Sequence, residues 1–242
     1  MQTILHKNDL SDGIEFSNIV AADCEMMGLQ PNRDPLCLMQ LFDGIGDCHI
    51  VQFVDQKFDA PILKKLLGSL KSKTKIISST GYNSRELIYL NNKYKFKNSD
   101  HFYMVGGMGH TSSVALGYSL QTNKNTLCID GDGSMLMHLG SIKTAGTFAN
   151  NNFKYILLNN NTHDSVGGQK TYSSEINFEK LSKSLGFKKF FCIKKEIDLE
   201  KNIKKFLSCK HLSFLEVKIA NSRIRKLPRP DNLIEIKNKF MK

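Results

Sequence analysis

Two short polar motifs in the middle of the chain each close an apolar run. Residues 131–133 read Gly-Asp-Gly and end the run TLCID, and residues 159–161 are three asparagines that end the run YILL. In an open parallel sheet, ligands bind beyond the carboxyl ends of the strands. If both runs are strands of one such sheet, we expect the two motifs to converge on a single site.

The residue types in these motifs suit a diphosphate held by a divalent cation. Gly131 and Gly133 let the backbone turn and approach a ligand closely, and a helix beginning near Ser134 would direct free N–H groups at an anion. The carboxylate of Asp132 and an asparagine amide oxygen are ligands that Mg²⁺ prefers. Gly-Asp-Gly alone could be a tight turn, but the asparagines at the end of the next strand favour a cofactor site.

The elements that must position these motifs follow two patterns. From residue 74 onward, strand-like apolar runs alternate with helix-like stretches, which predicts an α/β fold with a parallel sheet flanked by helices. Before residue 74 the pattern is three short strands and then a helix, at 16–25, 36–44, 48–54 and 59–73. This second pattern predicts a small antiparallel β-meander plus a helix, and hence two domains, residues 1–73 and 74–242.

The net charge of +11 is unevenly distributed along the chain. Residues 1–73 hold 7 Lys and Arg against 10 Asp and Glu, whereas residues 74–242 hold 27 against 13. The later lysines alternate with apolar residues in helix-like stretches, which indicates solvated helix faces and disfavours nucleic acid as a partner. Without an apolar run of membrane length or a signal-peptide stretch, we expect a cytoplasmic protein with no membrane partner.

The spacing of the two polar motifs resembles the diphosphate-binding module of thiamine-diphosphate enzymes, with 25 residues between Gly133 and Asn159. The resemblance implies thiamine diphosphate and Mg²⁺ as cofactors. It also implies that the metal is bound by Asp132, Asn160 and the backbone carbonyl of Thr162. Because the asparagines are triple, Asn159 remains an alternative to Asn160.

A wider set of motifs resembles the C-terminal half of the phosphonopyruvate decarboxylases and, more distantly, the beta subunit of the sulfopyruvate decarboxylases. These motifs cover residues 75–242 and read TGYNSREL, FYMVGGMGHTSSVALGYSL, GDGSMLMHLGS, LLNN, HDSVGGQ and RPDNLIEIKNKFM. The resemblance implies eight cofactor-binding residues, namely Gly106, Gly107, Met108, Gly131, Asp132, Gly133, Ser134 and Asn160. Met108 would press the cofactor into its bent form, and the alternative for this side chain is core packing.

The tripeptide His163-Asp164-Ser165 is typical of the phosphonopyruvate branch of this resemblance. These three residues are candidate catalytic residues that would bind the anionic substrate or move a proton. Alternatively, Asp164 and Ser165 cap the backbone of the loop. The implied activity is decarboxylation of a small anionic 2-oxo acid, 3-phosphonopyruvate to phosphonoacetaldehyde and CO₂ in phosphonate biosynthesis, with sulfopyruvate as the competing substrate.

One part of such an enzyme has no counterpart in this sequence. The resemblance implies that a glutamate from a pyrimidine-binding module activates the cofactor, and residues 1–73 do not resemble that module. We therefore expect a separate pyrimidine-binding subunit or domain as a partner, in a homo- or hetero-oligomer.

Residues 1–73 instead resemble the start of the ribonuclease D-like 3′–5′ exonucleases, which have a ribonuclease H-like fold. The resemblance rests on VAADCEMMGLQPNRDPLCLMQLFDGIGDCHIVQF followed by DAPILKKLL, and it implies that Asp23 and Glu25 are metal ligands. The later acidic motifs of that family do not follow. Two alternatives to a decarboxylase subunit therefore stay open: an inactive fusion of two fragments, and a metal-dependent 3′–5′ exonuclease.

Overall fold

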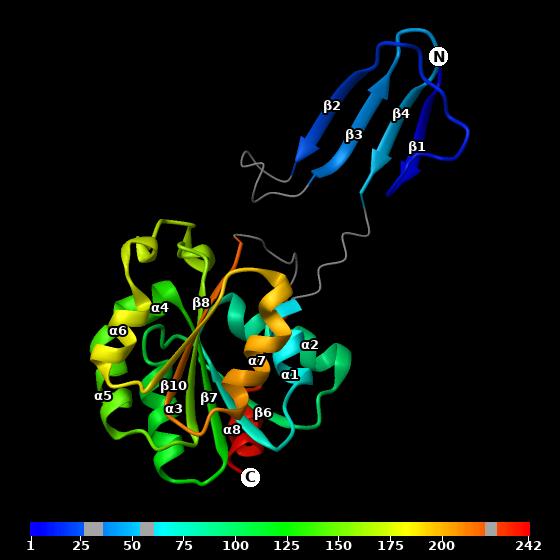
Figure 1. Cartoon of the computed structure of the whole chain (residues 1–242). Helices are drawn as coiled ribbons and strands as arrows, with labels where there is room; N and C mark the ends of the chain where they lie inside the picture. Colours follow the sequence, from blue (N-terminus) through cyan, green and yellow to red (C-terminus); the bar gives the residue numbers. More distant parts are fainter. Residues whose placement is uncertain (27–35, 54–60, 221–226) are drawn as a thin grey trace. The chain divides into compact units, whose positions relative to one another are not determined.

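The computed structural model describes residues 1–26, 36–53, 61–220 and 227–242 (Figure 1). Contacts between residues divide the chain into two compact units. The smaller unit holds strands β1 to β4, and the larger unit holds all the other elements. Within the described residues, no helix is long and apolar enough to cross a membrane.

The larger unit is built on a six-stranded parallel sheet with the strand order β6-β5-β7-β8-β10-β9. Its strands are β5 (Thr74–Ser78), β6 (Ser99–Tyr103), β7 (Asn125–Gly131), β8 (Phe153–Asn159), β9 (Lys189–Ile193) and β10 (Ser213–Lys218). Every residue of β5 and β8 is buried, as expected for strands covered on both faces. The predicted α/β fold is thus confirmed.

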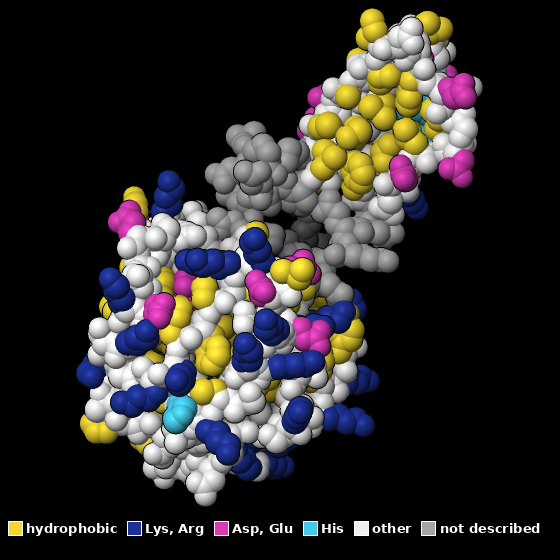
Figure 2. Space-filling model, in the orientation of Figure 1, with side chains coloured by type: hydrophobic (Ala, Val, Ile, Leu, Met, Phe, Trp, Pro, Cys, Tyr) yellow, Lys and Arg dark blue, Asp and Glu magenta, His cyan; other side chains and the backbone are white. Residues whose placement is uncertain are grey.

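Helices cover both faces of this sheet (Figure 1). They are α1 (Pro61–Gly68), α2 (Tyr82–Tyr94), α3 (Thr111–Leu120), α4 (Asp132–Met137), α5 (Leu139–Phe148), α6 (Phe178–Leu185), α7 (Leu199–Ser208) and α8 (Leu233–Met241). Contacts join α1 to α2 and α7, and they join α3 to α5 and α5 to α6. Lys and Arg side chains are spread over the visible helices of this unit in Figure 2, which agrees with solvated helix faces.

One cluster of core residues in the larger unit joins the sheet to α3, α5, α6 and α8. Tyr155 of β8 stacks on Phe214 of β10 with ring centroids 4.9 Å apart, and Phe187 meets the same ring edge-on at 5.3 Å. Phe240 of α8 packs against Phe102 and Tyr118, which ties the C-terminal helix to β6 and α3. These buried aromatic rings hold the strands in the register that positions the loops at the carboxyl edge.

The helix that was expected to begin near Ser134 is followed directly by a second one, and the two are α4 and α5. His138 has φ −142° and ψ 50°, so it ends α4 and precedes α5. The backbone of Gly109 approaches here so closely that a Cβ at that position would lie 3.2 Å from His138 Cβ. His138 also packs on His110, with ring centroids 4.8 Å apart. The break is therefore caused by tertiary contacts with the 104–110 loop, which local sequence pattern does not reveal.

The smaller unit is a four-stranded sheet with the order β1-β4-β3-β2. Its strands are β1 (Thr3–Lys7), β2 (Ala21–Met26), β3 (Leu36–Phe42) and β4 (Cys48–Gln52). The predicted antiparallel pairs β2–β3 and β3–β4 are present, but the sheet is mixed, because β1 pairs parallel with β4. The polar N-terminal segment gave no strand signal, so β1 was not expected. The stretch 27–35 of the exonuclease-like motif lies outside the described residues.

Helix α1, which the sequence pattern grouped with the N-terminal strands, packs within the larger unit. Its Leu63, Leu66 and Leu67 are buried, and it contacts α2 and α7. Lys65 of α1 forms an ion pair of 2.8 Å with Glu200 of α7.

Candidate functional site

The two polar motifs lie at the same edge of the six-stranded sheet. Strands β7 and β8 are parallel neighbours, and Gly131 pairs with Leu158 at the end of their ladder. Asp132 and Asn159 therefore lie next to each other at the carboxyl edge, as the sequence predicted. This is the edge at which open α/β sheets bind ligands.

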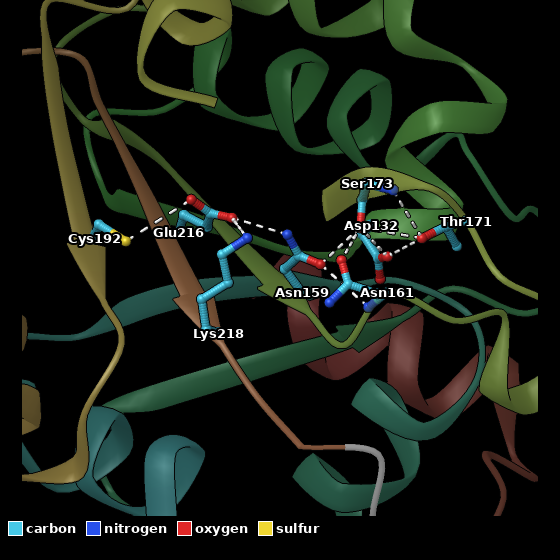
Figure 3. Close-up of polar contacts among 8 residues, drawn as sticks. All are labelled: Asp132, Asn159, Asn161, Thr171, Ser173, Cys192, Glu216 and Lys218. Atoms are coloured by element: carbon cyan, nitrogen blue, oxygen red, sulfur yellow. Dashed lines mark hydrogen bonds and ion pairs between the residues drawn. The ribbon is translucent and has the colours of Figure 1, made fainter. Parts of the chain in front are cut away.

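Asp132 is the first residue of α4 and is only 2% exposed. Its Oδ2 accepts hydrogen bonds from Thr171 Oγ1 at 2.5 Å and from Ser173 Oγ at 2.8 Å (Figure 3). The described residues donate no hydrogen bond to the other carboxylate oxygen, Oδ1. The carboxylate is thus fixed from one side by two hydroxyls.

The three asparagines differ sharply in their surroundings. Asn159 is fully buried, with Oδ1 2.8 Å from Ser173 Oγ and Nδ2 donating to Glu216 Oε1 at 2.8 Å. Asn161 has a left-handed backbone, φ 60°, and its Oδ1 lies 2.8 Å from Ser173 Oγ. Asn160 is half-buried, and its Oδ1 accepts a hydrogen bond from the Thr162 amide at 3.1 Å.

Beneath these motifs, a second aspartate supports the turn after β7. Asp130 is fully buried and accepts hydrogen bonds from the Tyr155 hydroxyl at 2.9 Å and from the Gly131 amide at 3.0 Å. Burial raises the pKa of this carboxyl, against the hydrogen bonds that lower it. Asp130 holds the backbone that presents Asp132.

The loop that contains Gly106, Gly107 and Met108 is joined to the Gly-Asp-Gly segment. The amide of Gly109 donates to Ser134 Oγ at 3.0 Å, which ties this loop to the first turn of α4. Gly106 has φ 70°, a backbone conformation that favours glycine. Met108 is half-buried next to this junction, and its role in bending a cofactor stays a prediction.

The segment His163-Asp164-Ser165 lies over the same edge. A Cβ on Gly133 would meet the His163 ring at 2.4 Å, and a Cβ on Gly81 would meet Ser165 Oγ at 2.8 Å. The loop closes on itself, because the His163 amide donates to the Gln169 carbonyl at 2.8 Å. The structure thus places His163 against the Gly-Asp-Gly turn and Ser165 against Gly81, whereas the chemical role of the tripeptide stays a prediction.

Sequence reasoning missed Glu86, a half-buried carboxyl group on α2. Burial, together with the negative charge of Asp164, raises its pKa to about 7. It lies in the quoted motif TGYNSREL, but a glutamate on an amphipathic helix carries no signal by itself. A half-buried carboxyl group with a pKa near 7, close enough to Asp164 to be affected by its charge, is a candidate for proton transfer.

Thr171, Ser173 and Glu216 were also missed. Only Glu216 had a usable signal, because it interrupts the apolar strand SFLEV at a position that a parallel sheet buries. Thr171 and Ser173 lie in a polar loop whose fold was not predictable.

The donor set fits a hard divalent cation. The Asp132 carboxylate, the Asn160 amide oxygen and the Thr162 carbonyl offer oxygen atoms only, and a Mg²⁺ ion held there would need phosphate oxygens and water to complete its coordination. Asn159 fits less well, because two groups already contact its Oδ1, the Ser173 hydroxyl at 2.8 Å and the Asn161 amide at 3.2 Å, whereas Asn160 Oδ1 accepts from the Thr162 amide alone among the described residues.

The exonuclease-like pair lies on the smaller unit. Asp23 and Glu25 alternate along β2, so both face the same side of the sheet, and both are exposed. Asp23 Oδ1 accepts a hydrogen bond from the Cys24 amide at 3.0 Å. The described part of the chain contains no group of three or more His, Cys, Asp or Glu side chains that could hold a metal ion. Metal binding by this pair stays a hypothesis.

Comparison with known families and proteins gives consistent matches to the larger unit. Residues 81–217 match the family described as thiamine pyrophosphate enzyme, C-terminal TPP binding domain. The chain is 40% identical over 126 residues to phosphonopyruvate decarboxylase of Streptomyces viridochromogenes, a match that covers 52% of this chain and 30% of the relative. It is 33% identical over 169 residues to sulfopyruvate decarboxylase subunit beta of Methanococcus maripaludis, covering 69% of this chain and 86% of the relative.

A solved structure shows the same fold. The 2-oxoglutarate:ferredoxin oxidoreductase from Magnetococcus marinus superposes with a TM-score of 0.50 at 17% identity, covering 65% of this chain and 61% of the other. At this identity the likeness concerns the fold alone. The chain spans less than a third of the phosphonopyruvate decarboxylase that it matches.

Proposed function

This chain belongs to the thiamine pyrophosphate enzymes that share the C-terminal TPP-binding domain, and on that premise we propose that it is the cofactor-binding part of a 2-oxo acid decarboxylase. The observation that carries the proposal is the carboxyl edge of the sheet, where Asp132 and the asparagines meet the 104–110 loop. The relatives named above are decarboxylases of phosphonopyruvate and sulfopyruvate.

In this proposal, Mg²⁺ is held by Asp132, Asn160 and the Thr162 carbonyl. Gly131, Gly133 and Ser134 lie where the diphosphate would reach the first turn of α4. Gly106, Gly107 and Met108 would contact the organic part of the cofactor from the neighbouring loop. When bound, thiamine diphosphate supplies the electron sink for loss of CO₂.

The substrate is proposed to be a small 2-oxo acid with a second anionic group. Both kinds of relative carry such a substrate in their names, and phosphonopyruvate is favoured because of the His163-Asp164-Ser165 tripeptide. In this proposal His163, which lies against Gly133, would bind the substrate's anionic end or move a proton. Glu86 is a second candidate for proton transfer, because its pKa lies near 7.

A pyrimidine-binding partner is proposed to complete the site. The relative from M. maripaludis is itself a beta subunit, and this chain covers 86% of its length. Its name therefore supports an arrangement in which the second half of the active site lies on another polypeptide.

The test is CO₂ release from phosphonopyruvate and from sulfopyruvate, with thiamine diphosphate and Mg²⁺. The chain is assayed alone and with an added pyrimidine-binding subunit of a sulfopyruvate decarboxylase. We expect activity only with the partner, loss of activity in Asp132→Ala, and full activity in Asp231→Ala, an exposed aspartate on the same unit. Folded chain that neither binds thiamine diphosphate nor releases CO₂ in any combination would instead favour an inactive fusion of two fragments.

A further inference from the structure

A buried polar chain runs from the middle of the sheet to Asp132. It passes from Glu216 on β10 to Asn159 on β8, from Asn159 to Ser173, and from Ser173 to Asp132 (Figure 3). Glu216 is 5% exposed, and the other three residues are at most 2% exposed. Burying this many polar groups costs free energy unless each has a hydrogen-bond partner. In this chain every one of the four side chains has such a partner.

Glu216 fixes which way the Asn159 amide points. An ionised carboxylate can only accept hydrogen bonds, and Glu216 Oε1 faces Asn159 Nδ2 at 2.8 Å. Lys218 Nζ lies 2.7 Å from Glu216 Oε1 and compensates the negative charge of the carboxylate. Cys192 Sγ lies 3.8 Å from the other carboxylate oxygen, Glu216 Oε2. Because Nδ2 must face Glu216, Asn159 Oδ1 is turned toward Ser173.

The Ser173 hydroxyl lies within hydrogen-bond distance of three acceptor oxygen atoms. Its Oγ lies 2.8 Å from Asp132 Oδ2, from Asn159 Oδ1 and from Asn161 Oδ1. With only one proton to donate, the hydroxyl links the end of β7 to the end of β8 through a shared contact. Thr171 adds a second donor to the same oxygen of Asp132.

From this geometry we infer that Glu216 and Ser173 are positioning residues for the metal site, an inference that rests on the proposed function. The two hydroxyls engage Asp132 Oδ2 and leave Oδ1 to face a cation. Asn159 Oδ1 is already contacted by the Ser173 hydroxyl and the Asn161 amide, so Asn159 serves as a link, and Asn160, whose Oδ1 is contacted by the Thr162 amide, supplies the metal-binding amide. Glu216 acts through Asn159 and Ser173 and does not itself touch the cofactor. Partners of this kind orient metal ligands in other proteins.

The test measures Mg²⁺ affinity at a fixed thiamine diphosphate concentration by calorimetry, since the chain has no tryptophan to report binding. Ser173→Ala and Glu216→Gln are each expected to weaken Mg²⁺ binding by about tenfold to a hundredfold. The matched controls are Ser174→Ala and Glu175→Gln, exposed neighbours on the same loop that should bind Mg²⁺ as the wild type does. A further control, Leu67→Ala in the buried face of α1, should lower the melting temperature without changing Mg²⁺ affinity.

A second readout needs no cofactor. Hydrogen exchange of the Asn159 side-chain amide, followed by NMR of the cofactor-free full chain, should be slow in the wild type. It should be at least tenfold faster in Glu216→Ala, but unchanged in Glu175→Gln. If the wild type binds no thiamine diphosphate, the proposed function fails, and slow exchange then still shows that Glu216 orients Asn159. Wild-type Mg²⁺ affinity in both Ser173→Ala and Glu216→Gln, or fast exchange of the wild-type amide, would overturn the inference.

Discussion

At the residue scale, Glu86 links the protonation of one carboxyl group to the stability of the fold. Its pKa is raised from an ordinary 4.5 to about 7, mainly by burial and then by Asp164. Between these two values, the folded chain holds a proton that the unfolded chain releases. The contribution of Glu86 to stability should therefore be fully present below pH 4.5 and should fall as the pH rises from 4.5 to 7, by about 3 kcal/mol at most.

Glu86→Gln tests this because it removes the titrating group and keeps the size of the side chain. Over pH 5 to 7.5, the variant should lose less stability than the wild type in thermal or urea unfolding. Glu175→Gln, an exposed glutamate, should follow the wild-type curve. Parallel curves for the wild type and Glu86→Gln would mean that Glu86 is ionised throughout this range.

Gly133 is a residue whose missing side chain makes room for another. A Cβ at this position would lie 2.4 Å from His163 Nδ1 and 2.5 Å from Cε1, so Gly133→Ala must displace the histidine ring. We expect a loss of about 1–3 kcal/mol in unfolding free energy and weaker binding of thiamine diphosphate. Calorimetric unfolding of Gly133→Ala can be compared with Gly117→Ala, a helical glycine with open space around it, which should not be destabilised. Equal melting temperatures for Gly133→Ala and the wild type would contradict the contact.

Which residues of the site could be read from the sequence depends on whether their role is local. Gly131, Asp132 and Gly133 were predictable because a turn, a helix start and a carboxylate are adjacent in the chain. Ser173 was not, because its role arises only when a loop returns to the ends of two strands. Glu216 was visible only as a charge in an apolar strand, which says nothing about its partner.

At the scale of elements, two glycines allow a close approach between neighbouring segments. Gly146 in α5 faces the end of α6, where Gly186 adopts φ 111°. A Cβ on Gly146 would lie 2.1 Å from the Leu185 carbonyl oxygen, a backbone atom that cannot swing away. Gly146→Ala should therefore force α5 and α6 apart, at a cost of about 1–3 kcal/mol or more.

The matched control for this prediction lies in the same helix. A Cβ on Gly140 would have no other atom within 4 Å, so Gly140→Ala should be neutral or stabilising by up to about 1 kcal/mol through helix propensity. Chemical denaturation of both variants separates helix propensity from the steric clash. Both variants replace glycine with alanine in the same helix, but only the Cβ at position 146 would meet the Leu185 carbonyl. A Gly146→Ala protein as stable as Gly140→Ala would show that the two segments are not in contact.

Helices and strands were predictable from the sequence where an apolar pattern marks them. They were not predictable where contacts with distant parts of the chain determine the local structure. The inner strands β7 and β8 contain apolar runs, since both faces of the sheet are covered, whereas the edge strand β6 (SDHFY) is mostly polar. The break at His138 depends on the approach of Gly109, and strand β1 depends on pairing with β4. Neither leaves a trace in the local sequence.

At the scale of the whole molecule, the two units differ in how much core they possess. A cluster of fifteen buried residues, from Ile77 to Phe240, lies entirely in the larger unit. Among the described residues before Pro61, Val51 is the one buried apolar side chain, at 3% exposed. A four-stranded sheet with so little buried apolar surface is expected to be marginal by itself.

This difference predicts the behaviour of the two units when they are separated. A chain of residues 61–242 retains α1, whose buried leucines and ion pair with α7 belong to the larger unit. It should unfold cooperatively, with a melting temperature within a few degrees of the full chain, and should bind thiamine diphosphate with Mg²⁺ as the full chain does. A chain beginning at residue 74 lacks α1 and leaves apolar surface on α2 and α7 uncovered, so it should be less stable by several kcal/mol. Residues 1–53 alone should show no cooperative transition. Equal stability of the chains beginning at 61 and at 74 would contradict the assignment of α1, because it would place the domain boundary after that helix.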